Sequence, residues 1–234
     1  MANHVLITGV SSGIGRACSE EFIDKGFEVI GWDLVPGEDP RVDVRAVDVT
    51  DWLDVSEAAR NLPPLHAVVT CAGKGVRGAV MDLPPESWHD VLSVNVIGTV
   101  YTAMAAFPAL QSGAGTLVTI GSITATSTFK VRAQYSVSKA GVVALTRSLA
   151  NEWAEYGIRV ICVSPGFTRT PMLEAGVAAG LTDMEVLLAH TPQRELIEPR
   201  ELAASIRALT SDDFRRVTGA NVLVDAGWET LTGF

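Results

Sequence analysis

Concentrated positive charge is missing from this chain. Among its 234 residues, 18 are Lys or Arg and 27 are Asp or Glu, so the formal net charge is −9, and basic residues never occur more than two in a row. Proteins that bind DNA or RNA neutralise the phosphates with a dense basic surface. We therefore expect no nucleic acid among the partners of this protein.

Cysteine and histidine are also scarce, and their spacing forms no recognisable site. The three cysteines, Cys18, Cys71 and Cys162, are odd in number and far apart, and the four histidines show no spacing typical of metal ligands. Disulfide frameworks and zinc sites need closely patterned residues of these types. We expect reduced thiols and no metal. The N-terminus shows no secretory signal, which favours the cytoplasm.

Long hydrophobic runs are lacking too, although 47% of the residues are hydrophobic and the mean hydropathy is +0.26. Charges, glycines or prolines interrupt each run before it reaches the roughly 18–20 residues of a membrane-spanning helix. The composition is typical of a chain with a large core. It predicts no membrane partner.

Short segments rich in Val and Ile alternate with longer segments of helical periodicity. The expected strands are Val5–Thr8, Glu28–Trp32, Arg45–Asp48, Ala67–Thr70, Thr116–Ile120, Arg159–Ser164 and Asn221–Val224. The expected helices are Ile14–Lys25, Asp51–Arg60, Pro85–Leu110, Tyr135–Tyr156 and Pro199–Leu209. Nearly all-apolar strands separated by helices predict a parallel sheet covered on both faces. The fold class is therefore α/β, a single Rossmann-type domain over 1–234 with a doubly wound sheet of about seven strands.

The segment Phe167–Ile197 departs from this alternation. An insertion after the carboxyl end of a strand commonly forms a lid over a site. An ordinary pair of surface helices is an equally good interpretation. We carry both, with a substrate lid at 167–197 as the functional prediction.

A glycine-rich loop joins the first expected strand to the first expected helix. It reads TGVSSGIG at 8–15. Gly9 permits a tight turn, Gly13 and Gly15 let the backbone approach a pyrophosphate, and the helix N-terminus attracts the anion. The residues expected at the phosphates are Gly9, Ser11, Ser12, Gly13, Ile14 and Gly15.

Asp33 ends the second expected strand, 18 positions after Gly15. A carboxylate there accepts hydrogen bonds from the hydroxyls of an adenine ribose and repels a 2′-phosphate. No Lys or Arg lies between Gly26 and Pro40 to offset this repulsion. NAD is therefore the expected cofactor, and a solvated carboxylate at a strand end is the alternative.

Tyr135 and Lys139 lie four positions apart on one expected helix, which places them on the same face. An adjacent ammonium favours the phenolate form of the tyrosine, the form that a general base needs. Ser122, thirteen residues before Tyr135, can donate a hydrogen bond to the same substrate oxygen. An incidental Tyr/Lys pair is the alternative for an isolated motif, but the glycine loop and Ser122 argue against it.

Several motifs, in their order and spacing, resemble the short-chain dehydrogenase/reductase family. They are the loop at 8–15, Asp48-Val49, Cys71-Ala72-Gly73, Asn95, Ser122, Tyr135-x-x-x-Lys139, the Pro-Gly segment at 165–170 and the Val-Asp-Ala-Gly segment at 224–227. The resemblance covers most of the chain. It implies a dinucleotide cofactor and a catalytic set of Asn95, Ser122, Tyr135 and Lys139.

The same resemblance implies which other residues contact the cofactor. They are Asp33, Asp48, Val49, Cys71, Ala72, Gly73, Tyr135, Lys139, Phe167, Thr168 and Thr170. In the family Lys139 would reach the nicotinamide ribose, and Asn95 would hold a water that relays protons. A structural cap or bend is the alternative for Asn95. Cys71 departs from the family pattern, which has Asn at this position.

The motifs do not specify the substrate. Lys74, Arg77, Lys130 and Arg132 are expected near it, where they either select an anion or are merely solvated. Phe129, Trp228 and Phe234 either line an apolar pocket or only pack.

The expected function is NAD-dependent oxidation of a secondary alcohol or cyclic dihydrodiol to a carbonyl, or the reverse. A catalytically silent NAD-binding regulatory or scaffold protein is the alternative. A lyase or dehalogenase would lose the glycine loop, and an enoyl reductase would space its tyrosine and lysine more widely.

We also expect a homo-oligomer, a tetramer or dimer, because the helix Tyr135–Tyr156 carries extra apolar residues. These residues are Val142, Val143, Leu145 and Leu149.

Overall fold

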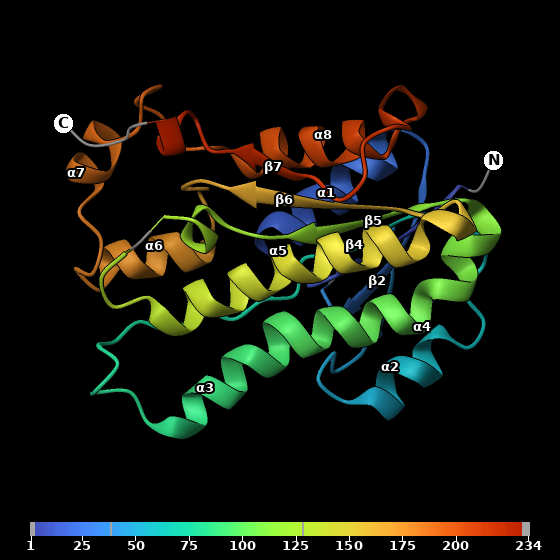
Figure 1. Ribbon diagram of the computed structural model, residues 1–234, viewed down its shortest axis with the longest axis horizontal. Helices are drawn as coiled ribbons and strands as arrows, with labels where there is room; N and C mark the ends of the chain where they lie inside the picture. The colour runs from blue at the N-terminus through green and yellow to red at the C-terminus, as the bar shows by residue number, and fades with distance from the viewer. Residues whose placement is uncertain (1–2, 38, 128, 231–234) are drawn as a thin grey trace.

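The computed structural model describes residues 3–37, 39–127 and 129–230 and shows one twisted parallel sheet between two layers of helices (Figure 1). The strands are β1 His4–Thr8, β2 Glu28–Asp33, β3 Asp43–Ala46, β4 Leu65–Thr70, β5 Thr116–Ile120, β6 Arg159–Pro165 and β7 Asn221–Val224. Their order in the sheet is β3-β2-β1-β4-β5-β6-β7. The chain reverses its direction of winding between β1 and β4, as in Rossmann-type folds. This confirms the expected fold class.

The helices cover both faces of the sheet. They are α1 Gly13–Asp24, α2 Trp52–Ala59, α3 Pro85–Leu92, α4 Gly98–Gly113, α5 Ala133–Trp153, α6 Pro171–Ala178, α7 Met184–Ala189 and α8 Pro199–Thr210. Helices α1 and α8 lie on one face, while α2, α4 and α5 lie on the other (Figure 1). Each layer encloses a hydrophobic core, one containing Phe22 and the other Trp32. The central strands β4 and β5 are buried on both faces, which explains their nearly continuous apolar sequences.

The helix expected over Pro85–Leu110 is one long rod with a change of pitch in the middle. Between α3 and α4 the segment Ser93–Ile97 is a π-helix. By length and composition alone the helix Pro85–Gly113 could span a membrane, contrary to the expectation from the interrupted runs. In this fold α4 instead packs on β4, and Ala103, Ala106 and Leu110 are buried there.

Several element boundaries differ from the sequence-based expectation, and two of the differences lie near the carboxyl edge of the sheet. Strand β3 covers Asp43–Ala46 rather than Arg45–Asp48, so the strand ends two residues earlier. The Val47 amide still donates to Asp33 O at 2.9 Å, but beyond it the chain turns away along the end of the sheet. Helix α5 begins two residues before Tyr135, with Arg132 as its N-cap residue. Both shifts bring additional side chains to the carboxyl edge of the sheet.

The segment Phe167–Ile197 contains two helices, α6 and α7, so it does have regular structure. Its two ends are fixed to each other, because Ile197 N donates to Phe167 O at 3.0 Å and Arg169 N donates to Ile197 O at 2.9 Å. The helix pair stands beyond the carboxyl ends of the strands (Figure 1). This position is compatible with a lid, and the lid itself remains a prediction.

Candidate functional site

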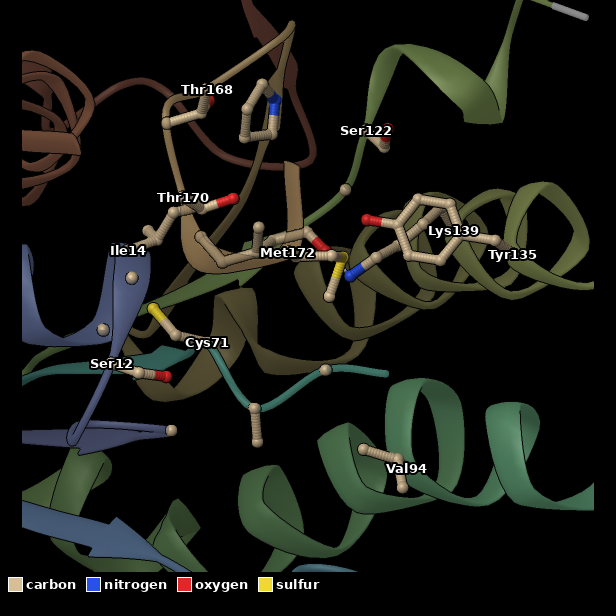
Figure 2. Close-up of a pocket in the computed structure, with 18 of the residues that line it drawn as sticks. Ser12, Ile14, Cys71, Val94, Ser122, Tyr135, Lys139, Thr168, Thr170 and Met172 are labelled. Carbon is tan, nitrogen blue, oxygen red and sulfur yellow. The ribbon is translucent and has the colours of Figure 1, made fainter. Parts of the chain in front are cut away.

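A cavity of about 430 Å³ opens at the carboxyl edge of the sheet. Most of the residues that the sequence singles out line this cavity. They are Gly9, Ser12, Gly13, Ile14, Gly15, Asp33, Asp48, Val49, Cys71, Ala72, Gly73, Ser122, Tyr135, Lys139, Phe167, Thr168 and Thr170. Two predicted residues, Ser11 and Asn95, are not on its wall. In Figure 2 Ser12 and Ile14 lie at one end of this pocket, and Tyr135 and Lys139 lie at the other.

The glycine loop is packed too tightly for larger residues at two positions. Gly9 has a φ of +66°, and a Cβ atom there would lie 2.8 Å from Ala72 N. A Cβ atom on Gly15 would lie 2.1 Å from Gly9 O. The Thr8 hydroxyl strengthens the same junction by accepting from Ala72 N at 3.1 Å. Glycine is therefore required here so that the first turn of α1 can sit directly against the end of β1.

The N-terminus of α1 has the properties of an anion site. Its N-cap residue, Ser12, makes no side-chain capping bond, and the first turn contains no acidic residue. The N–H groups of Gly13, Ile14 and Gly15 thus remain available to donate to a ligand. They lie at the positive end of the helix dipole. Because this turn lines the cavity, it fits the pyrophosphate of a dinucleotide.

Asp33 lies at the end of β2, beside this loop. One carboxylate oxygen accepts from Ser11 N at 3.0 Å and the other accepts from Val35 N at 3.1 Å. These bonds hold the carboxylate at the edge of the cavity with acceptor positions to spare, as ribose recognition requires. Ser11 therefore holds Asp33 through its backbone amide. Its hydroxyl is buried without a partner among the described residues.

Asp48 and Val49 follow β3 along the same wall. The Asp48 carboxylate accepts from Thr50 N at 2.8 Å and from Thr50 Oγ1 at 2.7 Å, and the Asp48 amide donates to Asp54 at 2.6 Å. Trp32 and Val47 complete an apolar slot beside them. A flat heterocycle such as adenine fits this end of the cavity.

At the other end, Tyr135 and Lys139 are brought together by one turn of α5. The Lys139 Nζ atom lies 5.5 Å from the centroid of the Tyr135 ring and donates to Ile120 O at 2.8 Å. Only 5% of Lys139 is exposed, and it forms no ion pair within the residues that the structure describes. Figure 2 shows the Tyr135 hydroxyl directed into the pocket, with the Lys139 ammonium close to it. A buried charge without a counter-ion is costly, so a functional reason for keeping it is expected.

Ser122 follows β5 and faces the same space (Figure 2). Its Oγ atom accepts from Thr124 N at 3.1 Å, which fixes the side chain at the start of the 3₁₀ turn Ile123–Ala125. Over the described parts of the chain its hydroxyl proton has no acceptor, so it is free to donate into the cavity. This is the geometry required to bind a substrate oxygen next to a general base.

Asn95 lies behind the cavity in the π-helical segment. Its side-chain amide donates to Lys74 O and to Ser138 Oγ, each at 2.9 Å, and its Oδ1 accepts from Lys74 N at 2.7 Å. The Asn95 carbonyl accepts from the Thr99 hydroxyl at 2.8 Å. Asn95 thus ties the helix to the loop after β4, and both of its amide protons are used. π-Helical segments often occur at functional sites.

Comparison with known proteins identifies the family. A family model described as enoyl-(acyl carrier protein) reductase matches residues 9–229. Galactitol 2-dehydrogenase of Rhizobium johnstonii is 34% identical over 241 residues, which cover 95% of this chain and 93% of that protein. The chain belongs to the short-chain dehydrogenase/reductase family. Like other members, it is an oxidoreductase of alcohols or ketones with a nicotinamide dinucleotide site.

Solved structures agree with the fold. The ligand-free aldohexose dehydrogenase of Thermoplasma acidophilum superposes with a TM-score of 0.92 at 26% identity, covering 99% of this chain and 96% of that one. ElxO with NADP bound gives a TM-score of 0.89 at 25% identity, covering 98% and 100%. The chain spans 44% of the length of another relative, the uncharacterized short-chain type dehydrogenase/reductase y4vI of Sinorhizobium fredii.

Cys71, the departure from the family pattern, lies where β4 ends and packs against the buried Cys18 of α1. A hydrogen bond with Cys71, together with burial, raises the pKa of the Cys18 thiol well above its ordinary value. Cys18 is therefore a protonated core thiol at neutral pH. The family asparagine is replaced here by a residue that suits this apolar contact.

The four basic residues near the site have different surroundings. Lys74 forms an ion pair with Asp90 at 2.9 Å, and Lys130 is exposed and away from the cavity wall. Arg77 donates to Leu181 O, and its second guanidinium nitrogen donates to Thr182 Oγ1 at 2.5 Å, so it binds the connection between α6 and α7. Only Arg132 among these four lines the cavity.

Aromatic residues form one wall of the same end. Phe129 stacks on Trp228 at 5.8 Å between ring centroids, and Phe167 meets Trp228 edge-on at 4.7 Å. Phe234 lies outside the described residues. Met172 of α6 reaches over the pocket (Figure 2), a position that no sequence motif indicated. Other lining residues that the motifs missed are Trp32, Leu34, Val47, Val94, Ile120, Gly121, Ile123, Thr124, Pro171 and Leu173.

Proposed function

We propose that this protein oxidises a secondary alcohol to a ketone, or catalyses the reverse reduction, with Tyr135 as the general base and acid. The observation that carries the proposal is the buried Lys139 ammonium, uncompensated by any described carboxylate, beside the Tyr135 ring. Such a charge lowers the stability of the fold, and it lies next to the ring whose hydroxyl would exchange the proton. A scaffold protein without turnover has no need for it.

The proton leaves the substrate hydroxyl for the Tyr135 oxygen. Ser122 donates a hydrogen bond to the same substrate oxygen and holds it against the phenol. When bound, the dinucleotide supplies the acceptor for the hydride that leaves the alcohol carbon. Asn95 supports this set indirectly, because it fixes the loop after β4 against α5 through Lys74 and Ser138.

We propose NAD rather than NADP as the preferred cofactor. Asp33 supports this choice, since its carboxylate would face the 2′-position of the ribose with no described cation paired to it. A structural neighbour, ElxO, was solved with NADP bound, so the phosphorylated cofactor also occurs on this fold. The choice therefore depends on the charge at this position.

The substrates named for the relatives favour hydroxylated carbon chains or rings. Galactitol is a polyol, and an aldohexose is a sugar. The mixed wall of the cavity, with aromatic rings beside Ser122 and Tyr135, suits such a carbon frame with one reacting hydroxyl.

The decisive experiment is NADH formation by the purified protein with a panel of polyols, cyclic diols and hydroxy acids. A ketone panel with NADH tests the reverse direction. An α,β-unsaturated thioester belongs in that panel, because the matching family model is described as an enoyl reductase. Turnover of an alcohol or ketone that disappears in Tyr135→Phe supports the proposal. Cofactor binding without turnover of any of these compounds would instead support the silent-scaffold alternative.

A further inference from the structure

Arg132 is a cation at the reacting end of the cavity, and no described carboxylate pairs with it. Its guanidinium carbon lies 5.9 Å from the centroid of the Tyr135 ring, and its side chain is partly buried. Among the residues that the structure describes, its guanidinium group forms no ion pair and donates no hydrogen bond. Arginine has five N–H donors, and leaving them unused in a partly buried place is costly.

A second cation, Arg77, lies near Arg132. Burial lowers the pKa of Arg132 and the Arg77 cation lowers it further, while Tyr135 acts in the opposite direction. Two carboxylates on neighbouring segments are already engaged: Asp90 pairs with Lys74, and Glu229 accepts from Ser127 and Thr126. Of the four basic residues Lys74, Arg77, Lys130 and Arg132, only Arg132 lines the cavity, where it joins the buried Lys139.

The backbone holds Arg132 in this place. Val131 has a φ of +56°, a conformation that β-branched residues rarely adopt, and its carbonyl accepts from Gly78 N at 3.1 Å. Unfavourable backbone conformations persist where the surrounding structure enforces them, and they are common at binding sites. Here the enforced turn carries the chain from the aromatic residue Phe129 into the first turn of α5.

We propose that Arg132 binds a carboxylate of the substrate, so that the compound oxidised at Tyr135 is a short hydroxy acid. The proposal rests on the proposed function and names its substrate class. The fork of guanidinium N–H groups matches a carboxylate in a bidentate manner. Phe129 and Phe167 then pack against the carbon frame, and the hydroxyl lies between Ser122 and Tyr135.

The reaction leaves the carboxylate unchanged. The hydroxyl proton passes to the Tyr135 oxygen, and the hydrogen on the same carbon leaves with its electron pair as hydride to NAD⁺. A carbon–oxygen double bond forms, and the product is the keto acid. Because Arg132 lies so close to the Tyr135 ring, the carboxylate must be near the reacting carbon.

The test compares short hydroxy acids with their primary amides, which have nearly the same shape and no charge. The hydroxyl is placed alpha, beta or gamma to the carboxyl carbon. We expect the wild-type kcat/KM for at least one acid to exceed that of its amide by about 30-fold or more. Arg132→Gln should remove this preference, and Arg132→Lys should restore part of it as a point charge.

Lys130→Gln is the matched control, since it removes the same charge from an exposed residue on the same turn. It should leave the preference unchanged. An equal loss for acids and amides in Arg132→Gln would overturn the proposal and make Arg132 a positioning residue for Tyr135. Equal wild-type activity on both forms would overturn it as well. Melting temperature and NADH affinity show whether the variants are folded.

A binding measurement separates this proposal from the proposed function. Butyrate and butyramide, which have no hydroxyl to oxidise, are titrated into the NADH complex. Preference for butyrate that disappears in Arg132→Gln supports the anion site even if no alcohol is turned over. Turnover of neutral polyols with no preference for butyrate would instead leave the function standing and overturn the anion site.

Discussion

Lys139 donates a hydrogen bond from its ammonium to Ile120 O at 2.8 Å and lies 5.5 Å from the centroid of the Tyr135 ring. The ammonium is thus held by the end of a central strand and directed at a residue one helical turn away. The carbonyl satisfies one of its three donors and does not neutralise its charge. The remaining charge is available to the Tyr135 oxygen or to the hydroxyls of a bound ribose.

Tyr135→Phe should lower kcat by about 10²- to 10⁴-fold, the usual contribution of a general acid–base group. The substitution keeps the ring and its packing and removes only the hydroxyl directed into the cavity (Figure 2). NADH affinity, measured by fluorescence titration, should change little. Tyr101→Phe on α4 is the control, because it removes a phenolic hydroxyl from outside the cavity. Near-normal turnover of Tyr135→Phe would contradict the assignment.

Asp33→Ala should weaken NADH binding by about 1–3 kcal/mol and reduce the discrimination against NADPH. The alanine removes both the acceptors and the charge. Asp33→Asn is the milder change, because it removes the charge and keeps one of the two oxygen acceptors. We expect the asparagine variant to gain NADPH affinity while losing part of its NADH affinity. Dissociation constants for both nucleotides provide the measurement, and a wild-type protein that prefers NADPH would refute the role of Asp33.

Arg77 should stabilise the helix pair α6–α7. Its bonds to Leu181 O and Thr182 Oγ1 join the loop after β4 to the connection between these helices. Hydrogen bonds from charged groups contribute about 1.5–3 kcal/mol, so Arg77→Met should speed amide exchange in 172–190 by about 10- to 100-fold. Lys74→Met, on the same loop but paired with Asp90, should leave this exchange unchanged.

The lid prediction concerns the same segment. Cofactor with a bound ketone should slow exchange over 172–190, because a closed helix pair excludes water from the reacting groups. Equal protection with and without these ligands would show that α6 and α7 are an ordinary surface helix pair.

We propose that the protein is a homo-oligomer, although not through all the residues that the sequence suggested. Val142 and Val143 of α5 are buried inside the chain, where they pack against Cys162 of β6. On α4 and α5 the exposed apolar residues include Met104 and Val137, at 52% and 51% exposure. Such side chains are typical of an interface.

Light scattering should therefore give a mass well above that of the 24.8 kDa chain. Val137→Lys should reduce this mass, because it places a charge on the predicted interface. Val80→Lys is the control, as Val80 is exposed to a similar extent on a different surface segment. A stable monomer at micromolar concentration would rule out the oligomer.

Local sequence patterns predicted the parts of this structure that depend on local physics. The glycine loop and the Tyr135/Lys139 spacing follow from turn geometry and helix periodicity, and both lie where the patterns indicated. The different surroundings of Arg77 and Arg132 did not follow, because they depend on contacts with segments distant in the chain, such as 181–182. Sequence patterns did not predict the π-helical segment at Asn95 for a similar reason, since Asn95 is bonded to Lys74 and Ser138.

The periodicity of apolar residues on α5 also did not predict which of them are buried inside the chain. A helix that packs on a sheet along one side and on α3 along another buries more than one stripe, so the apolar count does not reveal a free surface. This explains why Val142 and Val143 were assigned to an interface. The motifs likewise indicated that Cys71 departs from the family pattern. They did not predict its contact with Cys18, because this contact depends on the packing of α1 against the end of β4.

The contact between Cys18 and Cys71 makes the stability of the fold depend on pH in the alkaline range. The pKa of Cys18 is raised well above 9.0 in the folded chain, first by the hydrogen bond with Cys71 and then by burial. Above the ordinary thiol pKa the unfolded chain loses this proton while the folded chain keeps it. The folded state then binds more protons, so the free energy of unfolding falls as pH rises.

Urea unfolding between pH 7.5 and 10.5, with a reductant present, measures this slope. The wild-type protein should lose about 1.4 kcal/mol more per pH unit than Cys18→Ala once the unfolded thiol ionises. The comparison uses the slopes, because the alanine also leaves a small cavity that lowers stability equally at every pH. Iodoacetamide should leave Cys18 unmodified until the protein unfolds, since the buried thiol is protonated and inaccessible. Parallel pH curves for the two proteins would show that the proton on Cys18 has no energetic link to folding.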